Sequence, residues 1–282
     1  MPDVFAQTFS IESTRPSVAE IDRIGAILPQ GTPVYLTAVP TQSPGELTGA
    51  AAAVRKAGLE PVVHIAARRV AGAADLQDLL KGLRGEADVR RLLVIGGDVD
   101  QIGPFADALA VIQKGRLREA GIEEIGIGAY PEGHPRIASG RLEAALDEKI
   151  AAAKAHGLKL HLASQFSFSP EGILAWLKRL RACGISAPVK VGMAGPTSLP
   201  ALLRYARRCG VNASMRGLMS GAASALIGNV GPDRIVETLS AAADIGEAHP
   251  HYFSFGGLAA TASYAVDMAQ AMMPERRAAT GA

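Results

Sequence analysis

Five polar residues lie at or just after the end of an apolar run of strand length and could carry chemistry: Glu12, Thr37, Asp98, Tyr130 and Gln165. A carboxylate in such a position can act as a general acid or base, and hydroxyl or amide groups can orient a ligand. Glu12 is therefore the first candidate acid. Taken alone, it is equally consistent with a hydrogen-bonded structural carboxylate, so its surroundings must decide.

The alternation of side chains along the first run indicates where Glu12 points, because successive residues of a strand face opposite sides. Glu12 shares its side with small and polar residues, whereas the other side is large and apolar. The two sets are Ala6, Thr8, Ser10 and Glu12 on one side and Phe5, Phe9 and Ile11 on the other. We expect the polar side to line the interior of a barrel.

Two later runs show the same alternation. Gln165 shares a side with His161, so its amide is expected to point inward near the end of its strand. Tyr130 shares a side with Gly126 and Gly128, which have no side chains. This pattern predicts room for a planar ligand beneath the Tyr130 ring.

Composition and spacing disfavour several other kinds of site. The formal net charge is +2, with 29 Lys and Arg against 27 Asp and Glu, so no strong attraction to nucleic acid or an anionic membrane is expected. The six histidines are dispersed and none lies in the first run, so we expect no metal site of the barrel-hydrolase type. Lys159 and Lys190 fall early in their runs, where a Schiff-base lysine would be far from the mouth of a barrel.

Strand-length runs alternate with helical segments along the chain. Ser43-Pro44-Gly45-Glu46 illustrates a helix start, with Ser43 as cap and Glu46 completing a capping box. The eight runs expected to form strands are Val4 to Ser13, Pro33 to Val39, Pro61 to Ala67, Arg91 to Asp98, Glu124 to Tyr130, Lys159 to Phe166, Val189 to Ala194 and Tyr252 to Phe255. Because strict alternation implies parallel strands with right-handed crossovers, we predict an α/β fold, a single (β/α)8 TIM barrel.

An open doubly wound sheet is the alternative fold, but residues 9–16 contain no glycine and so lack the phosphate-binding turn of a dinucleotide fold. We expect the barrel to span residues 1–273 and residues 274–282 to form a frayed tail. The sequence shows no secretory or membrane segment, and Cys183 and Cys209 are expected to be free thiols. These features predict a cytoplasmic protein that acts on a small molecule.

Four short motifs, in their order and spacing, resemble the methylenetetrahydrofolate reductase family over nearly the whole chain. They are Phe9-Ser10-Ile11-Glu12, Ile95-Gly96-Gly97-Asp98, Gly128-Ala129-Tyr130-Pro131-Glu132-Gly133-His134-Pro135 and Ser164-Gln165-Phe166. The run from Ala129 to Pro135 is the most specific of these motifs. Each of the others would be a weak signal by itself.

This resemblance implies an oxidoreductase of one-carbon metabolism and methionine biosynthesis. FAD would bind at the C-terminal mouth of the barrel and take hydride from NADH or NADPH. The hydride would reduce 5,10-methylenetetrahydrofolate to 5-methyltetrahydrofolate, or the reaction would run in reverse. A folate is thus the implied substrate partner, and the resemblance permits homo-oligomers.

The resemblance also implies roles for individual residues. Glu12 matches the general acid that protonates a ring nitrogen of the folate and so exposes a carbon to hydride. Asp98 matches an aspartate that serves catalysis and contacts both flavin and pterin. Gln165 matches a folate contact, and Phe255 lies in the segment that corresponds to a folate-holding run. The implied cofactor contacts are Thr37, His64, Gly97, Asp98, Tyr130, His134 and Lys149.

Lys149 and His161 are also open to a purely structural interpretation. Lys149 has an alternative interpretation as a solvated helix residue. His161 has no counterpart in the family and is expected to be a core histidine whose hydrogen bonds are satisfied.

The sequence departs from the family pattern near the cofactor and the substrate. Gly96 replaces an arginine, and Ala145 replaces a flavin-contacting amide. No aromatic residue occurs in Pro196 to Leu199, and Phe253 to Leu258 lack the family's Asn and Arg. Two alternatives to an FAD-dependent reductase therefore stay open: a divergent member with a non-nicotinamide donor or without FAD, and a non-catalytic folate-binding subunit, which the presence of Glu12 disfavours.

Overall fold

The barrel strands of the computed structural model, which describes residues 5–209 and 229–273, are hydrogen-bonded in the order β1-β10-β7-β6-β5-β4-β3-β2 and close into a barrel. The pairs β2–β3, β3–β4, β4–β5 and β7–β10 are parallel. Helices alternate with these strands along the chain. The predicted (β/α)8 TIM barrel is thereby confirmed, and the open doubly wound sheet is excluded.

The barrel strands are four to seven residues long and are followed by helices or short loops. The barrel strands are β1 (Ser10–Ser13), β2 (Pro33–Leu36), β3 (Glu60–Ala66), β4 (Arg91–Ile95), β5 (Glu124–Ala129), β6 (Lys159–Ser164), β7 (Val189–Ala194) and β10 (Ala248–Phe253). The helices are α1 (Val18–Gly25), α2 (Pro44–Lys56), α3 (Ala73–Ala87), α4 (Ala108–Lys114), α5 (Ser139–Ala155), α6 (Pro170–Ala182), α7 (Leu199–Cys209), α9 (Asp233–Ser240) and α10 (Leu258–Ala271). A 3-10 helix, η1 (Ala67–Arg69), follows β3, and the short strands β8 (Thr197–Ser198) and β9 (Asn229–Val230) form a separate antiparallel sheet.

The first and last strands differ from the prediction. β1 begins at Ser10 rather than Val4, because residues 5–7 form a turn before the chain enters the sheet. β10 begins at Ala248, earlier than the predicted Tyr252. It includes Pro250, a residue that lacks a backbone N–H and is normally unfavourable inside a strand.

Four of the polar candidates lie just beyond their strands. Thr37, Asp98, Tyr130 and Gln165 follow the last residues of β2, β4, β5 and β6, whereas Glu12 lies within β1. Their strands are therefore shorter at the C-terminal end than predicted. The chain leaves the sheet there and frees these side chains from the alternation of the strand.

The local sequence explains why α2 forms. The Oγ atom of Ser43 accepts a hydrogen bond from the backbone N–H of Glu46 at 3.2 Å, and the Glu46 carboxylate accepts one from the Ser43 N–H at 2.7 Å. Leu47, Ala51 and Val54 are buried at helical spacing. Burying a leucine or valine side chain stabilises a fold by about 1.5–3 kcal/mol, so this helix is held by its core face as well as its cap.

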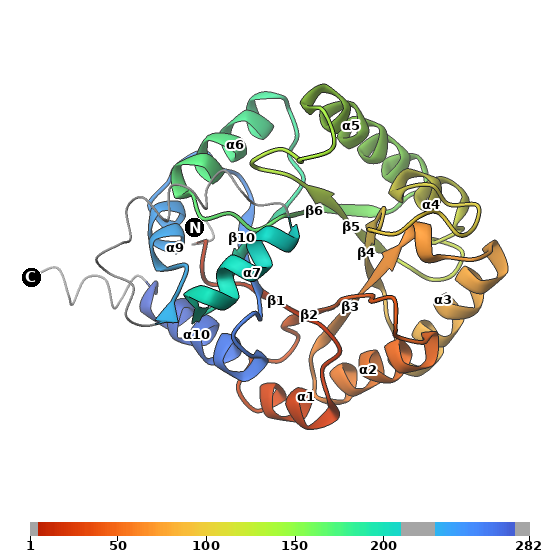
Figure 1. Cartoon of the computed structure of the whole chain (residues 1–282), viewed down its shortest axis with the longest axis horizontal. Helices are drawn as coiled ribbons and strands as arrows, with labels where there is room; N and C mark the ends of the chain where they lie inside the picture. The colour runs from red at the N-terminus through yellow and green to blue at the C-terminus, as the bar shows by residue number, and fades with distance from the viewer. Residues whose placement is uncertain (1–4, 210–228, 274–282) are drawn as a thin grey trace, which may run out of the picture. The chain divides into compact units, whose positions relative to one another are not determined.

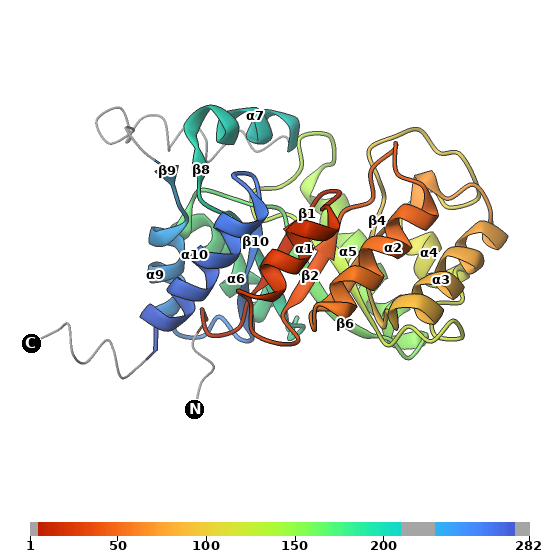
Figure 2. The ribbon, with the colours of Figure 1, turned by 90° about the horizontal axis from the view of Figure 1, so that it is seen from below.

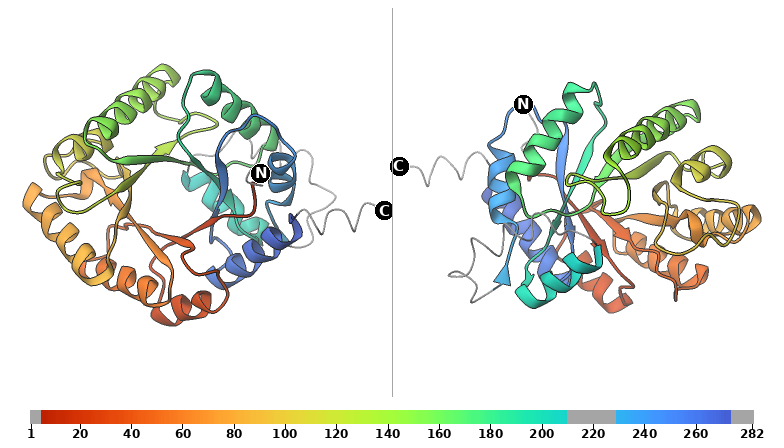
Figure 3. Two further views of the ribbon diagram at one scale, coloured as in Figure 1. Left: turned by 180° about the vertical axis from the view of Figure 1, so that it is seen from behind. Right: turned by 45° about the horizontal axis from the view of Figure 1, so that its top comes forward.

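The chain divides into two compact units by its internal contacts. The Glu12 unit comprises Glu12–Ala129 and Ser139–Ala163, and the Gln165 unit comprises Met1–Ile11, Tyr130–Ala138 and Ser164–Ala282. In the Glu12 unit, α2 packs against α3 and β3, and α4 packs against α5 (Figure 1). In the Gln165 unit, α7 lies beside β8 (Figure 2), α6 contacts α9, and α10 contacts β10 (Figure 3).

Some predictions concern residues or properties outside this description. The predicted frayed tail, residues 274–282, and the side chain of Cys209 lie outside the described residues. The extent of a single domain over residues 1–273 stays a prediction. Cys183 is an exposed free thiol, as predicted. Within the described ranges, no helix is both long enough and apolar enough to cross a membrane.

Candidate active site

Glu12 lies in a contact group with side chains from β3 and from the loop after β2. Its Oε1 atom accepts a hydrogen bond from the Thr37 hydroxyl at 3.4 Å, and its Oε2 atom lies 3.4 Å from Nε2 of His64. The Thr14 hydroxyl donates to the Thr37 hydroxyl at 3.3 Å. The Glu12 side chain is 14% exposed. The carboxyl group is thus largely shielded from water, which suits an acid that transfers a proton to a bound molecule.

His64 is buried without hydrogen-bond partners. Its side chain is 4% exposed, and neither ring nitrogen has a hydrogen-bond partner among the described residues. The ring packs edge-on against Tyr35, with 6.1 Å between ring centroids. A buried polar group without a partner costs about 1–3 kcal/mol, so stability alone does not explain a histidine beside the Glu12 carboxylate.

Asp98 is paired with an arginine that sequence reasoning did not select. The guanidinium of Arg69 donates to the Asp98 carboxylate and, at 2.5 Å, to the carbonyl oxygen of Ala38. The preceding Gly97 has φ +93°, a left-handed conformation that favours glycine. The Asp98 carboxylate is therefore hydrogen-bonded by a guanidinium from another loop. Its donor lies at the end of η1, where the only sequence signal is the pair of arginines after the third predicted strand.

Lys149 lies on α5 in the same unit and is partly buried. Burial lowers the pKa of its ammonium group, and the negative charges of Asp107 and Glu148 oppose this shift. A lysine on an open helix face would not be desolvated in this way. Lys149 is therefore not a fully solvated helix residue.

A second group of polar side chains comes from the first residues of β4 and β5, Arg91 and Glu124, and from the middle of β2 and β6, Tyr35 and His161. Nδ1 of His161 is 2.7 Å from Oε1 of Glu124, and Nε2 is 2.7 Å from the hydroxyl of Tyr35. Oε2 of Glu124 lies 3.2 Å from Nε of Arg91. Burial, followed by the Glu124 charge, raises the pKa of Tyr35 above its ordinary range. His161 is confirmed as a core histidine with satisfied hydrogen bonds.

The room predicted at Gly126 is already filled, which corrects that part of the sequence interpretation. A Cβ atom added to Gly126 would lie 2.4 Å from Nε2 of His161 and 3.0 Å from a methyl carbon of Leu93. The missing side chain therefore makes space for the His161 ring and not for a ligand.

Gln165, Tyr130 and His134 belong to the Gln165 unit. Oε1 of Gln165 accepts a hydrogen bond from the N–H of Phe166 at 3.0 Å. The rings of Tyr130 and His134 meet edge-on, 5.2 Å between centroids, and Nδ1 of His134 accepts from the N–H of Arg136 at 3.1 Å. Burial raises the pKa of Tyr130; burial and then the Arg136 charge lower that of His134.

Phe255 lies in an aromatic cluster of this second unit. Its ring stacks on Tyr205 of α7 at 4.0 Å with an interplanar angle of 11°, and it contacts Phe166 at 5.1 Å. Phe168 and Phe253 complete the cluster. Phe166 thus links Gln165 to Phe255, and Tyr205 adds an aromatic ring that the sequence search around residues 196–199 did not find.

The predicted site residues therefore fall into separate contact groups. Glu12, Thr37 and His64 touch one another, and Asp98 is tied to the neighbouring loop by Arg69. Tyr130 touches His134, and Gln165 is linked to Phe255 through Phe166. Each group lies at or beyond the C-terminal half of its strands, where active sites of parallel barrels form.

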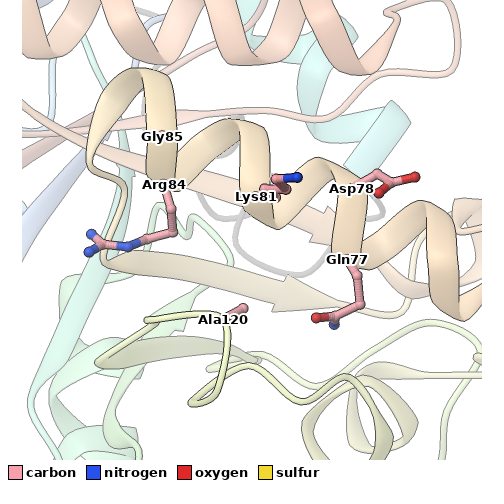
Figure 4. A pocket seen from close by; sticks show the side chains of 6 residues that line it. All are labelled: Gln77, Asp78, Lys81, Arg84, Gly85 and Ala120. Atoms are coloured by element: carbon pink, nitrogen blue, oxygen red, sulfur yellow. The ribbon is translucent and has the colours of Figure 1, made fainter.

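Among the described residues, neither a metal-ligand cluster nor a surface hollow coincides with these groups. Residues 5–209 and 229–273 contain no group of three His, Cys, Asp or Glu side chains that could hold a metal ion. A hollow of about 500 Å³ lies beside α3 (Figure 4). Its lining residues are Gln77, Asp78, Lys81, Arg84, Gly85 and Ala120. None of the predicted site residues lines this hollow.

Known structures resemble the fold. The chain is 14% identical to dihydropteroate synthase from Xanthomonas albilineans, with a TM-score of 0.50 over 98% of this chain and 95% of that one. It is 16% identical to dihydropteroate synthase from Thermus thermophilus, with a TM-score of 0.51 over 93% and 92%. A putative phosphonomutase from Burkholderia cenocepacia is 13% identical, with a TM-score of 0.52 over 89% and 87%. At these identities the likeness concerns the barrel fold alone.

Sequence comparison is more specific. A curated relative, the 5,10-methylenetetrahydrofolate reductase of Pectobacterium carotovorum subsp. carotovorum, is 30% identical over 109 residues, which are 38% of this chain and 35% of the relative. The matching region thus spans about a third of that relative's length. The family model described as methylenetetrahydrofolate reductase matches residues 11–223, well over half of the chain. This chain therefore belongs to the methylenetetrahydrofolate reductase family.

Proposed function

We propose that this protein reduces 5,10-methylenetetrahydrofolate to 5-methyltetrahydrofolate, or catalyses the reverse oxidation, with Glu12 as general acid. The observation that carries the proposal is the shielded Glu12 carboxyl group between the Thr37 hydroxyl and the buried His64 ring. Family membership supports the substrate class. The non-catalytic alternative does not account for a carboxylate held in this way.

The chemistry asked of Glu12 is a proton transfer to a ring nitrogen of the folate. Protonation breaks the bond from that nitrogen to the one-carbon unit, and the resulting iminium carbon accepts hydride. The Thr37 hydroxyl donates to one carboxyl oxygen and orients the group. Nε2 of His64 lies 3.4 Å from the other carboxyl oxygen, so the His64 ring flanks the group on its second side.

The residues of the Glu12 unit fit FAD. Neither ring nitrogen of the buried His64 has a hydrogen-bond partner among the described residues. The Lys149 ammonium group on α5 is partly desolvated, and this burial lowers its pKa. The His64 imidazole and the Lys149 ammonium group match a flavin heteroatom and a phosphate, respectively. The residues we assign to FAD are Thr37, His64, Gly97, Asp98, Tyr130, His134 and Lys149. FAD, when bound, would supply the hydride, and NADH or NADPH would supply it with electrons.

We assign the folate to Asp98, Gln165 and Phe255. Asp98 presents an exposed carboxylate that can accept hydrogen bonds from the N–H groups of a pterin. The Gln165 amide can donate and accept hydrogen bonds, and Phe255 belongs to a cluster on which an aromatic ring of the folate can pack.

A second candidate is a reductase of this family that works without bound FAD. Position 145 on α5 is an alanine, which offers no polar contact where the family has an amide, and position 96 is a glycine. A visible absorbance spectrum of the purified protein separates the two candidates, because bound FAD is yellow. A colourless protein that still reduces the folate would favour the second.

The Glu12→Gln variant tests the acid in either case. It keeps the shape of the side chain but removes the transferable proton, so folate reduction should fall by about 10²–10⁴-fold, the usual contribution of such a group. Glu86→Gln, at an exposed carboxylate of α3, is the matched control and should retain full activity. Equal folate turnover in wild type and Glu12→Gln would contradict the assignment of the acid.

A further inference from the structure

Arg69 forms an ion pair with Asp98. Its guanidinium bonds to the Asp98 carboxylate in the loop after β4 and to the Ala38 carbonyl oxygen in the loop after β2. The Arg69 side chain is 17% exposed, whereas that of Asp98 is 68% exposed. The Arg69 guanidinium is thus largely buried, whereas the Asp98 carboxylate is exposed to solvent.

This arrangement is unfavourable as a purely structural device. Nε of Arg69 is buried and has no hydrogen-bond partner in the part of the chain that the structure describes. Leaving a buried donor without an acceptor costs free energy, and so does taking a guanidinium out of water. An ion pair with a largely exposed carboxylate stabilises the fold only weakly, so it does not offset this unfavourable free energy. The gain must therefore come from what the pair does for Asp98.

The backbone of η1 is anchored without the Arg69 side chain. The N–H of Arg68 donates to the Gly96 carbonyl at 3.0 Å, and the N–H of Ile102 donates to the Arg68 carbonyl at 3.0 Å. Nε of Arg68 donates to the Ala106 carbonyl at 2.9 Å. A change at Arg69 should consequently remove the guanidinium from the Asp98 carboxylate while the loop after β4 stays attached.

We propose that Arg69 is the positioning residue of Asp98, supplying from the neighbouring strand's 3-10 helix the cation that Gly96 cannot provide. The inference rests on the proposed function, in which Asp98 accepts hydrogen bonds from the folate. A guanidinium fork restrains both the charge and the orientation of a carboxylate, whereas an ammonium group restrains mainly the charge. Arg69 thereby holds Asp98 as an acceptor of defined direction.

The test is the binding of 5-methyltetrahydrofolate to the full chain, measured by isothermal titration calorimetry. Arg69→Gln should weaken binding at least about tenfold, a ratio that corresponds to about 1.4 kcal/mol. Arg69→Lys should recover part of that loss, because it keeps the charge and loses the fork. When Asp98→Asn is already present, Arg69→Gln should cost less than about twofold, since the two residues act through one interaction.

Arg68→Gln is the matched control, because Arg68 lies in the same turn and its Nε donates to the Ala106 carbonyl oxygen. It should bind the folate within about twofold of wild type, and its thermal unfolding should match that of Arg69→Gln within the scatter of surface substitutions. Binding by Arg69→Gln that equals binding by Arg68→Gln would overturn the role of Arg69 and leave the proposed function standing. A loss that is the same with and without Asp98→Asn would overturn it too. A wild-type chain that binds no 5-methyltetrahydrofolate would instead contradict the proposed function, and the inference with it.

Discussion

The Glu12 unit contains two groups of the same chemical types, each a carboxylate, an imidazole and a hydroxyl. In one, Glu124, His161 and Tyr35 are joined by two contacts of 2.7 Å that engage both ring nitrogens. In the other, the Glu12 carboxylate lies 3.4 Å from a His64 ring that has no hydrogen bond among the described residues. Residue type alone does not distinguish a structural group from a functional one.

Position and hydrogen-bond satisfaction do distinguish them. Glu124 is the first residue of β5, at the end of the strands opposite the expected mouth, whereas Glu12 lies in the C-terminal half of β1 and Thr37 follows β2. A buried network with every partner in place rigidifies a core, and a group with unmet hydrogen-bonding capacity is ready for a ligand. The first group should therefore govern stability and the second should govern turnover.

The largest effect is expected for His161→Phe. This change keeps a ring of similar size but removes both nitrogens, so the Tyr35 hydroxyl and the Glu124 carboxylate lose a buried partner. The free energy of unfolding should fall by about 3 kcal/mol or more, as when one member of a buried polar pair is removed. Urea denaturation measures it. The same change at the exposed His156 should stay within about 0.5 kcal/mol of wild type.

The same substitution at His64 should affect stability differently. His64→Phe replaces two nitrogens that have no hydrogen bonds among the described residues, so the free energy of unfolding should stay within about 1 kcal/mol of wild type or rise. Folate reduction should slow at least about tenfold, which corresponds to about 1.4 kcal/mol in the barrier. Steady-state assays and urea denaturation of both variants decide the comparison. If His64→Phe unfolds the protein as readily as His161→Phe, the contrast between the groups is wrong.

The smallest effect is expected at Lys149, and it depends on pH. Burial lowers the pKa of Lys149 from 10.5, so the unfolded chain holds the proton more tightly than the folded one. The resulting penalty is fully present below the folded-state pKa and disappears as the pH rises to 10.5 and above. Lys149→Met should therefore be slightly more stable than wild type at neutral pH, with a gap that closes in alkali. Thermal unfolding between neutral and alkaline pH checks this.

Lys154→Met, at an exposed lysine of the same helix, is the control for that measurement and should show no pH-dependent gap. If Lys149 also contacts the flavin, Lys149→Met should weaken FAD binding while it gains stability. A gap that widens as the pH rises would contradict the buried environment of Lys149.

Much of the fold and part of the site could be predicted because they follow from local chemistry. The Ser43–Glu46 capping box needs only neighbours in sequence, and it is present. Side-chain alternation needs only a strand, and its prediction that Glu12 faces the interior of the barrel stays a prediction. The four short motifs, and above all the run from Ala129 to Pro135, indicated the family that the comparison then showed.

Other features depend on contacts between residues far apart in sequence. The occupant of the space at Gly126 is His161, 35 positions away, so an apparent vacancy in one strand is filled by a ring from another. The partner of Asp98 is Arg69 from a different loop, and Tyr205 of α7 stacks on Phe255. No spacing rule connects such pairs, because their distance is set by the packing of strands and helices.

The sequence by itself determined the alternation of strands and helices and the family to which the chain belongs. These depend on the periods of the strand and the helix and on short motifs. Only the tertiary structure decided that His161 is satisfied and His64 is not, and that Arg69 serves Asp98. Hydrogen-bond satisfaction depends on the direction and distance of atoms from separate strands, and the folded chain alone sets those.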